Sequence, residues 1–146
     1  MNSSRLSSEN LNASTVAIDG RAILITGPSG SGKSDLALRM LDRHYTLVSD
    51  DRTLVRRDGK RLIASSPETI RGKLEVRGIG IFDMDNVNDV PIALLVELTS
   101  EIQRLPDDLR ERPILGIQVP IVSVDAMTAS AASKVALALD RYGLQI

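Results

Sequence analysis

The chain has 146 residues, a formal net charge of −1 at pH 7, 42% hydrophobic residues and no cysteine. The near-neutral charge and the presence of only two tyrosines and one phenylalanine exclude the basic surface or stacking platform that nucleic-acid binding needs. The lack of cysteine excludes disulfides and thiolate metal sites. No apolar run approaches about 18 residues and no export signal begins the chain, which predicts a cytoplasmic protein without membrane contact.

The first elements are a tail and a hairpin. Residues 1–10 are rich in Ser and Asn and lack apolar periodicity, which predicts a mobile tail. Residues 11–146 have the size of a single domain. Within it, residues 11–18 are predicted to form a strand, and Asp19-Gly20 the turn into a second strand at residues 21–26.

The next stretch, GPSGSGKS from Gly27 to Ser34, matches the phosphate-loop pattern G-x-x-x-x-G-K-[ST] at every fixed position. It lies between the apolar strand at residues 21–26 and a predicted helix at residues 34–41, as the pattern requires. Glycines let backbone N–H groups close around phosphate oxygens, and the helix N-terminus attracts the anion. The loop therefore predicts a protein that binds a nucleoside triphosphate.

Two side chains of this loop have expected tasks. Lys33 would bridge β- and γ-phosphate oxygens, and the Ser34 hydroxyl would hold Mg²⁺, which prefers hard oxygen ligands. The predicted nucleotide- and phosphate-binding residues are Gly27, Ser29, Gly30, Ser31, Gly32, Lys33 and Ser34.

Two adjacent carboxylates follow the next predicted strand, at residues 46–49. The helix leads about 15 Å away from the phosphates, and the strand returns toward them at roughly 3.3 Å per residue. Asp50 and Asp51 are therefore expected near the phosphates, where a carboxylate reaches Mg²⁺, its water or the attacking nucleophile. A solvated turn is the alternative interpretation. His44, the only histidine, is interpreted as a solvated loop residue.

The middle of the chain predicts further turns. Asp58-Gly59 predicts a hairpin between strands at residues 53–57 and 61–64, and Ser66 is expected to cap a short helix that runs toward residue 72. Residues 74–82 have the composition of a strand interrupted by glycines. Glu75 and Arg77 would lie on the same side of it, as a buried ion pair or as a pair that faces a ligand.

The C-terminal third contains a buried strand and a helix. Residues 91–98 are predicted as a buried strand, residues 101–113 as a surface loop, and residues 114–124 as a strand pair broken at Pro120. Asp125 is expected to cap a helix over residues 127–142, which Gly143 ends. The small residues of this helix suit tight packing, including packing against another subunit.

The segment from Glu75 to Gly80, EVRGIG, completes a recognisable set together with the phosphate loop and Asp50-Asp51. These three motifs, in this order, resemble the catalytic domain of the bacterial HPr kinase/phosphorylase family. The similarity covers residues 11–143, without the N-terminal domain of full-length members. It implies an α/β fold, namely a P-loop domain with a mixed sheet, similar to phosphoenolpyruvate carboxykinase.

The resemblance implies two reactions in one site. One is the ATP-dependent phosphorylation of a serine in the small phosphocarrier protein HPr. The other is phosphorolysis of that phosphoserine by inorganic phosphate, which releases pyrophosphate. The resemblance also implies Mg²⁺ as cofactor, an HPr-type protein as partner, and a homo-oligomer, for which it suggests a hexamer.

The resemblance also assigns roles to residues. Asp51 would take the serine proton and return it in the reverse reaction, with support from Asp50. Arg77 lies in the signature stretch, and Arg104 is similar to a family arginine that handles phosphate. The expected catalytic residues are Asp51, Asp50, Lys33, Arg77 and Arg104, and the expected Mg²⁺ ligands are Ser34 and Glu75.

Three positions depart from the family pattern, and one of them is His44, which replaces the family's usual glycine in the turn after the loop helix. Asn12 stands where the family usually has a functional histidine, and Ala126-Met127-Thr128 stands near the place of a Gly-Arg-Asn stretch tied to dephosphorylation. Two other interpretations of the whole chain stay open. It could be a small-molecule P-loop kinase whose lid is the loop at residues 101–113, or a non-catalytic sensor of nucleotide or phosphate.

Overall fold

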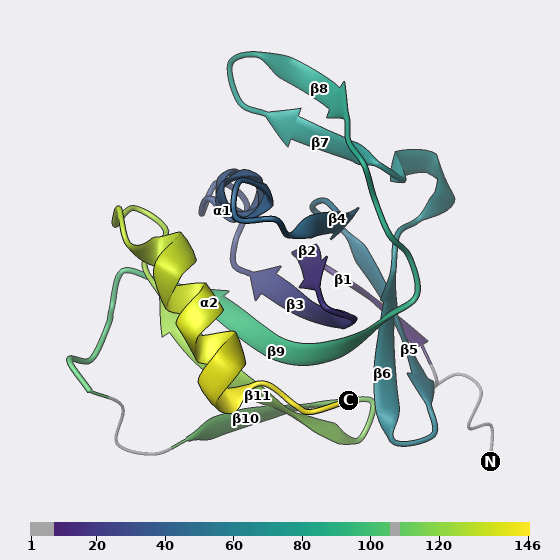
Figure 1. Cartoon of the computed structure of the whole chain (residues 1–146), viewed down its shortest axis with the longest axis vertical. Helices are drawn as coiled ribbons and strands as arrows, with labels where there is room; N and C mark the ends of the chain where they lie inside the picture. The colour runs from purple at the N-terminus through teal and green to yellow at the C-terminus, as the bar shows by residue number, and fades with distance from the viewer. Residues whose placement is uncertain (1–7, 106–108) are drawn as a thin grey trace.

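The computed structural model describes residues 8–105 and 109–146 and shows an α/β arrangement built on one curled, mixed sheet of nine strands (Figure 1). A separate two-stranded hairpin stands beside the sheet, and the described residues include two α-helices. The sheet contains β1 (Ser8–Leu11), β2 (Ala13–Ile18), β3 (Arg21–Thr26), β4 (Thr46–Ser49), β5 (Thr53–Asp58), β6 (Arg61–Ser65), β9 (Val90–Leu98), β10 (Arg110–Ile114) and β11 (Ile117–Val124). The other elements are α1 (Lys33–Leu41), a 3₁₀ turn at Glu68–Ile70, the hairpin of β7 (Lys73–Val76) and β8 (Gly80–Asp83), and α2 (Ala131–Tyr142).

The central strand is β9. It pairs in parallel with β3 along one edge and with β11 along the other, and its first residues pair antiparallel with β6. In this register Glu97 of β9 lies between Thr26 of β3 and Ser123 of β11. Because parallel strands end at the same edge of a sheet, the loops that follow β3, β9 and β11 gather in one place.

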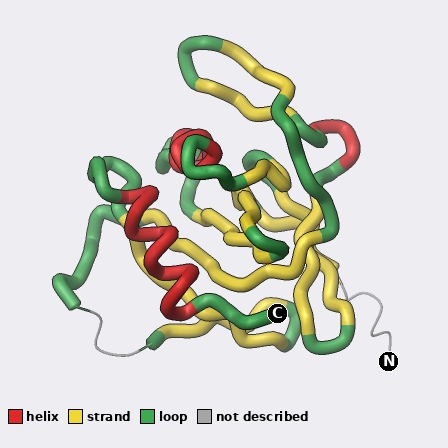
Figure 2. The backbone as a smooth tube through the Cα atoms, viewed as in Figure 1, coloured by secondary structure: helices red, strands yellow, loops and turns green. Residues whose placement is uncertain are grey.

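The core has two layers, one on each face of the sheet. On one face, Ile23 and Ile25 of β3 pack with the buried sides of α1 and α2. On the other face, Leu24 packs with residues of β5, β6 and β11, because the sheet curls over itself there. Figure 2 shows both helices on the same side of the strands. Burial on both faces explains why β3 and β9 are almost continuously apolar in sequence.

The predicted tail is wrong for residues 8–10. These residues belong to β1, which pairs antiparallel with β5, so that Leu11 lies opposite Thr53. The backbone of an edge strand can gain these hydrogen bonds without burying apolar side chains, and for this reason the polar composition of Ser8–Asn10 misled the prediction. Residues 1–7 of the predicted tail lie outside the described residues.

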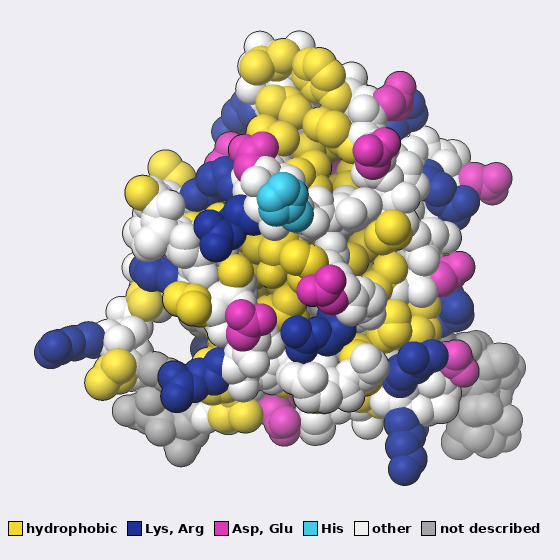
Figure 3. Space-filling model, viewed as in Figure 1, with side chains coloured by type: hydrophobic (Ala, Val, Ile, Leu, Met, Phe, Trp, Pro, Cys, Tyr) yellow, Lys and Arg dark blue, Asp and Glu magenta, His cyan; other side chains and the backbone are white. Residues whose placement is uncertain are grey.

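The predicted strand at residues 74–82 is in fact the β7–β8 hairpin. The chain reverses through Arg77, Gly78 and Ile79, and Gly78 adopts a φ angle of +83°, which favours glycine. The glycines therefore build a turn instead of interrupting a strand. The hairpin projects beyond the sheet (Figure 1), and apolar side chains gather on it (Figure 3), among them the exposed Ile79 and Ile81.

Two further boundaries in the C-terminal third differ from the prediction. Residues 110–113, expected in a loop, join Ile114 in the edge strand β10 (Arg110–Ile114), in which Pro113 is tolerated because β10 pairs only with β11. The turn lies at Leu115-Gly116 and Pro120 continues β11, because the parallel ladder with β9 begins only at Ile121.

The last helix begins at Ala131, four residues later than predicted. Asp125 does not cap it, because the Asp125 Oδ1 atom accepts a hydrogen bond from the Met127 N–H inside a separate turn. Gly143 ends the helix as predicted, and its N–H donates to the Leu139 carbonyl. No helix within residues 8–105 and 109–146 is long and apolar enough to span a membrane.

The short helix after residue 65 also differs at its start. It is a single 3₁₀ turn that begins at Glu68, and Ser66 does not cap it, since the Ser66 hydroxyl donates to the Pro67 carbonyl. The predicted hairpins at Asp19-Gly20 and Asp58-Gly59, the helix after the phosphate loop and the buried strand at residues 91–98 are confirmed.

Tyr45 provides a test of the packing between α1 and α2. It is 7% exposed, and burial, followed by the nearby negative charge of Asp140, raises its pKa above the ordinary value of about 10. The stability that depends on neutral Tyr45 is therefore present below about pH 10 and is lost at higher pH. We predict that Tyr45→Phe reduces the fall in unfolding free energy between about pH 9 and pH 11, measured by urea denaturation. Tyr142→Phe, at a more exposed tyrosine, is the matched control, and an equal effect of both changes would contradict the prediction.

Candidate active site

The phosphate-loop segment connects the end of β3 to the start of α1 in a tight turn. Gly30 and Gly32 adopt φ angles of +82° and +101°. A Cβ atom on Gly27 would lie 2.6 Å from the Ser31 hydroxyl, and one on Gly32 would lie 3.1 Å from the Ala126 Cβ. Only glycine fits these backbone angles and approaches without strain. The local structure is thus the strand, loop and helix that the motif predicts.

Two polar side chains lie within the loop itself. Lys33 is 6% exposed, and its Nζ donates to the Gly27 carbonyl at 2.8 Å and to the Pro28 carbonyl at 3.2 Å. Within the described residues the buried Ser31 hydroxyl has no hydrogen-bond partner. An ammonium held by neutral carbonyls and an unpartnered hydroxyl are groups that an anionic phosphate would satisfy.

Asp50 joins three separate elements beside this loop. It is 7% exposed, and its Oδ1 accepts hydrogen bonds from the Ser34 hydroxyl of α1 at 2.6 Å and from the Ser14 hydroxyl of β2 at 2.8 Å. Its Oδ2 accepts from the backbone N–H of Glu75 on β7 at 3.1 Å. One carboxylate therefore holds the loop helix, the sheet and the hairpin together. The three predicted residues Ser34, Asp50 and Glu75 lie next to one another.

Asp51 differs from Asp50 in its exposure, its backbone conformation and its hydrogen bonds. It is exposed and adopts a φ angle of +66°, which aspartate tolerates better than most residues. Its only hydrogen bond among the described contacts runs from its N–H to the Ser14 hydroxyl at 3.1 Å. The pair thus consists of one buried carboxylate that accepts three hydrogen bonds and one carboxylate open to solvent.

Ser14 contacts both aspartates and was not among the site residues predicted from the sequence. Ser14 is completely buried and lies in a strand whose neighbours are largely apolar. A lone serine in a buried strand is a signal for a polar contact, because a buried hydroxyl needs a partner. The identity of that partner could not be read from the sequence, since Asp50 lies 36 residues later.

The donor atoms of this cluster suit Mg²⁺ only together with a phosphate ligand. The described residues contain no group of three or more His, Cys, Asp and Glu side chains that could hold a metal ion by themselves. Ser34, Asp50 and Glu75 offer hard oxygen atoms, and Mg²⁺ is usually bound by one or two carboxylates, waters and substrate phosphates. These residues therefore fit a Mg²⁺ ion that arrives with a polyphosphate.

The remaining predicted site residues lie outside the Asp50 cluster. Arg77 is exposed in the turn between β7 and β8, and Arg104 is exposed in the segment after β9. No ion pair joins Glu75 to Arg77 within the described residues, and both are exposed, so the buried-pair interpretation is wrong. Asn12 is exposed between β1 and β2, and His44 is an exposed loop residue, as predicted.

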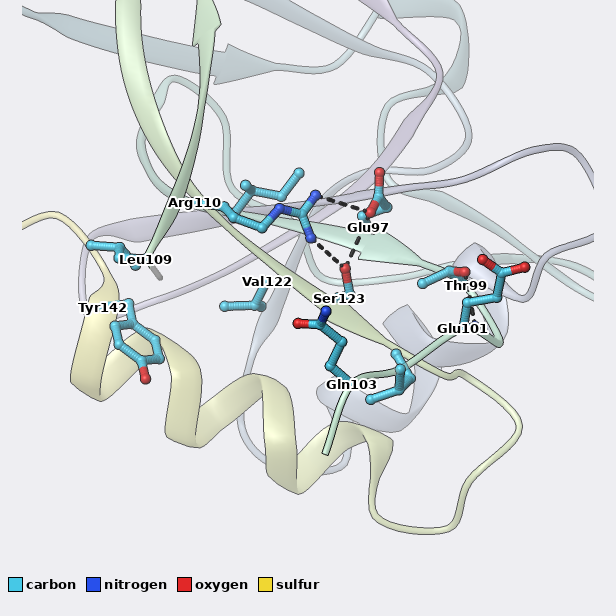
Figure 4. A pocket seen from close by; sticks show the side chains of 11 residues that line it. Glu97, Thr99, Glu101, Gln103, Leu109, Arg110, Val122, Ser123 and Tyr142 are labelled. Atoms are coloured by element: carbon cyan, nitrogen blue, oxygen red, sulfur yellow. Dashed lines mark hydrogen bonds and ion pairs between the residues drawn. The ribbon is translucent and has the colours of Figure 1, made fainter. Parts of the chain in front are cut away.

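Two hollows open where β9 and β11 end. The hollow of about 910 Å³ contains a network in which Glu97 accepts hydrogen bonds from Arg110 and Ser123 (Figure 4). None of its lining residues belongs to the phosphate loop or to the Asp50 cluster. The hollow of about 820 Å³ is lined by the phosphate loop itself and by residues that follow β9 and β11. Of these two hollows, only the smaller one therefore lies next to the predicted phosphate-binding residues.

Comparisons with known proteins point to one family. The family model described as HPr Serine kinase C-terminal domain matches residues 4–140. The chain is similar to the HPr kinase/phosphorylase of Latilactobacillus sakei, with 38% identity over 75% of this chain and 39% of the relative. It is also similar to that of Limosilactobacillus reuteri, with 37% identity over 82% of this chain and 42% of the relative. The chain thus spans about two fifths of the length of these curated relatives.

A solved structure shares the fold. The Hpr(Ser) kinase/phosphatase of Coxiella burnetii matches with a TM-score of 0.78 and 31% sequence identity. The match covers 91% of this chain and 88% of that chain.

The contrast between the two aspartates can be tested by stability. We predict that Asp50→Asn lowers the free energy of unfolding by about 1–3 kcal/mol, because an amide cannot accept hydrogen bonds at both positions. Asp51→Asn should change it by less than about 0.5 kcal/mol, since asparagine tolerates the same φ angle and the side chain is exposed. Urea denaturation of both variants provides the measurement. Equal destabilisation by the two changes would show that Asp50 does not hold the three elements together.

Proposed function

Because the chain belongs to the HPr serine kinase C-terminal domain family, we propose that it transfers the γ-phosphoryl group of ATP to a serine of an HPr-type phosphocarrier protein. The observation that carries this proposal is the contact between Asp50 and Ser34, the last residue of the phosphate-loop motif. Phosphoryl transfer requires positioned phosphates, neutralised oxygens and a carboxylate near the acceptor hydroxyl more than it requires covalent chemistry. The phosphate loop and Lys33, the Ser34–Asp50 pair and the exposed Asp51 are the residues that could meet these three requirements.

In this proposal the phosphate loop binds the nucleotide. The backbone N–H groups of the loop and the Lys33 ammonium contact phosphate oxygens, and Lys33 exchanges its carbonyl partners for them. Ser34 and Glu75 would hold Mg²⁺, with Asp50 beside them, since Asp50 contacts the Ser34 hydroxyl and the Glu75 backbone N–H. The chemistry that bound Mg²⁺ supplies is the neutralisation of phosphate charge.

Asp51 is the proposed general base. Its exposed carboxylate takes the proton of the acceptor serine while the serine oxygen bonds to the γ-phosphorus and the bond to ADP breaks. In phosphorolysis an oxygen of inorganic phosphate bonds to the phosphorus of the phosphoserine, the bond between that phosphorus and the serine oxygen breaks, and the pyrophosphate that forms is released. Asp51 then returns its proton to the serine oxygen, as microscopic reversibility requires. Ser14 positions this residue through its contacts with both aspartates.

Further parts of the proposal rest on family membership. The phosphate loop and the sheet would be arranged as in phosphoenolpyruvate carboxykinase, and residues 11–146 would form a single catalytic domain. The chain would assemble into a homo-oligomer such as a hexamer. Arg77 and Arg104 would handle phosphate from the hairpin and from the segment after β9.

Two observations favour a protein acceptor over a small metabolite. Exposed apolar side chains on the β7–β8 hairpin lie on the same element as Glu75, and such patches are typical of protein interaction sites. The lid that a small-molecule kinase would need at residues 101–113 is shortened, because Arg110–Ile114 form β10.

The proposal is tested by incubating the full chain with ATP, Mg²⁺ and an HPr-type protein from the same organism. We predict that the intact mass of the acceptor protein increases by one phosphoryl group, and that Lys33→Ala abolishes the increase while circular dichroism shows an unchanged fold. Subsequent addition of inorganic phosphate should remove the group and release pyrophosphate. No transfer in a single turnover, with ATP still bound, would favour the non-catalytic sensor.

The assignment of the base has its own test. We predict that Asp51→Asn lowers the rate of serine phosphorylation on the order of 10²–10⁴-fold, because the amide cannot accept the serine proton. The dissociation constant of ATP should change little, since Asp51 contacts neither the loop nor Ser34. Both quantities are measured on the same preparation by steady-state kinetics and calorimetry. A collapse of ATP affinity with altered Mg²⁺ dependence would instead place Asp51 at the metal and make Asp50 the base.

A further inference from the structure

The order of the strands places different elements on the two sides of the phosphate loop. β2 and β4 lie on one side of β3, and β9 with β11 lies on the other. Asp50 follows β4 and contacts Ser34, so a metal ion held by the proposed residues, and the γ-phosphate with it, would lie on the first side. A triphosphate that runs through the loop from that position directs its nucleoside end toward the ends of β9 and β11.

The hollow of about 820 Å³ lies on this second side. Its lining includes four residues of the phosphate loop, the ion pair of β9 and β10, two residues after β9 and the turn of residues 125–127 after β11, namely Gly27, Pro28, Gly30, Ser31, Glu97, Arg112, Thr99, Ser100, Asp125, Ala126 and Met127. Its volume falls within the range of about 300–1,000 Å³ that is typical of small-molecule sites. The hollow is thus large enough for a nucleoside and is continuous with the phosphate loop.

The turn at residues 125–128 is held firmly against the loop and α1. The Arg39 guanidinium of α1 donates to the Ala126 carbonyl at 2.5 Å and to the Thr128 carbonyl at 3.3 Å. The Thr128 N–H closes the turn by donating to the Asp125 carbonyl at 3.2 Å. A Cβ on Gly32 of the loop would lie 3.1 Å from Ala126, so the turn also packs on the loop.

Met127 lies in this turn, and its side chain is exposed to solvent. Its side chain is 89% exposed, more than any other exposed large hydrophobic residue among the described positions, although it lines the hollow. None of the aromatic residues lines the same hollow. Arg39 holds the backbone on both sides of Met127, while the exposed Met127 side chain has no packing role in the folded chain. A thioether packs well on an aromatic ring.

We propose that Met127 is the platform on which the nucleobase of the bound nucleoside triphosphate rests, and that the hollow beside it holds the nucleoside. This inference rests on the proposed use of a nucleotide. Asp125, Ser100 and Thr99 bring a carboxylate and two hydroxyls to the hollow, which are acceptors for the hydroxyl groups of a ribose. Arg39 acts as a positioning residue, because it fixes the backbone of the turn that carries Met127.

Binding of ATP and of inorganic tripolyphosphate separates the nucleoside from the phosphates. We measure both by calorimetry on the full chain with Mg²⁺ and without acceptor protein. Met127→Ala should weaken ATP binding about threefold to tenfold and change tripolyphosphate binding less than about twofold, because only ATP carries a base. Met127→Leu, which keeps the apolar surface, should restore ATP affinity to within about twofold of the natural protein. Leu137→Ala is the matched control, since Leu137 is 68% exposed on α2 and lies outside the hollow.

Each outcome decides the inference. Unchanged ATP affinity in Met127→Ala, or an equal loss for ATP and tripolyphosphate, would overturn it. A natural protein that binds tripolyphosphate as tightly as ATP would overturn it as well, and one that binds neither ligand would overturn both the inference and the proposed function. A protein that shows the expected pattern but transfers no phosphoryl group to an HPr-type protein would reject the proposed acceptor and leave the nucleoside site in place.

Discussion

The arrangement of the site depends on the buried carboxylate of Asp50. Hydrogen bonds from Ser14, Ser34 and the Glu75 backbone bring β2, α1 and the β7–β8 hairpin to one group. A carboxylate that is removed from water needs such donors, because an unpaired buried acceptor costs free energy. The three elements are far apart in sequence, so this requirement helps to fix the position of the hairpin, which forms its own small sheet and also buries Leu74.

The parallel pairing around β9 supplies the other constraint. Strands β3, β9 and β11 end at the same edge. The phosphate loop follows β3, and the segments after β9 and β11 lie beside it. The apolar side chains that alternate between two core layers hold this register, since a shift by one residue would exchange the two faces. The Asp50 cluster on one side and the smaller hollow on the other therefore occupy fixed positions relative to the loop. A nucleotide with a metal at one end and a base at the other matches this layout.

The predictions from the sequence succeeded where local chemistry decides the structure. The glycines and Lys33 of the phosphate loop, the turns at Asp19-Gly20 and Asp58-Gly59, and the apolar strand β9 are determined by residues close together in the chain. The predictions failed where strand pairing overrides the composition of a segment. Residues 8–10 join β5, and Pro113 lies in the edge strand β10. The polar or proline-rich composition of these segments indicated a tail and a loop.

By itself, the sequence predicted a phosphate loop between a strand and a helix, and the return of Asp50 and Asp51 toward that loop. Both conclusions follow from local spacing, which the rise per residue of helices and strands converts into distance. Only the tertiary structure decided which aspartate is buried, that Ser14 contacts both, and that Met127 stands exposed beside the loop. These features depend on contacts between residues tens of positions apart, and the burial and hydrogen bonds of such contacts exist only in the folded chain.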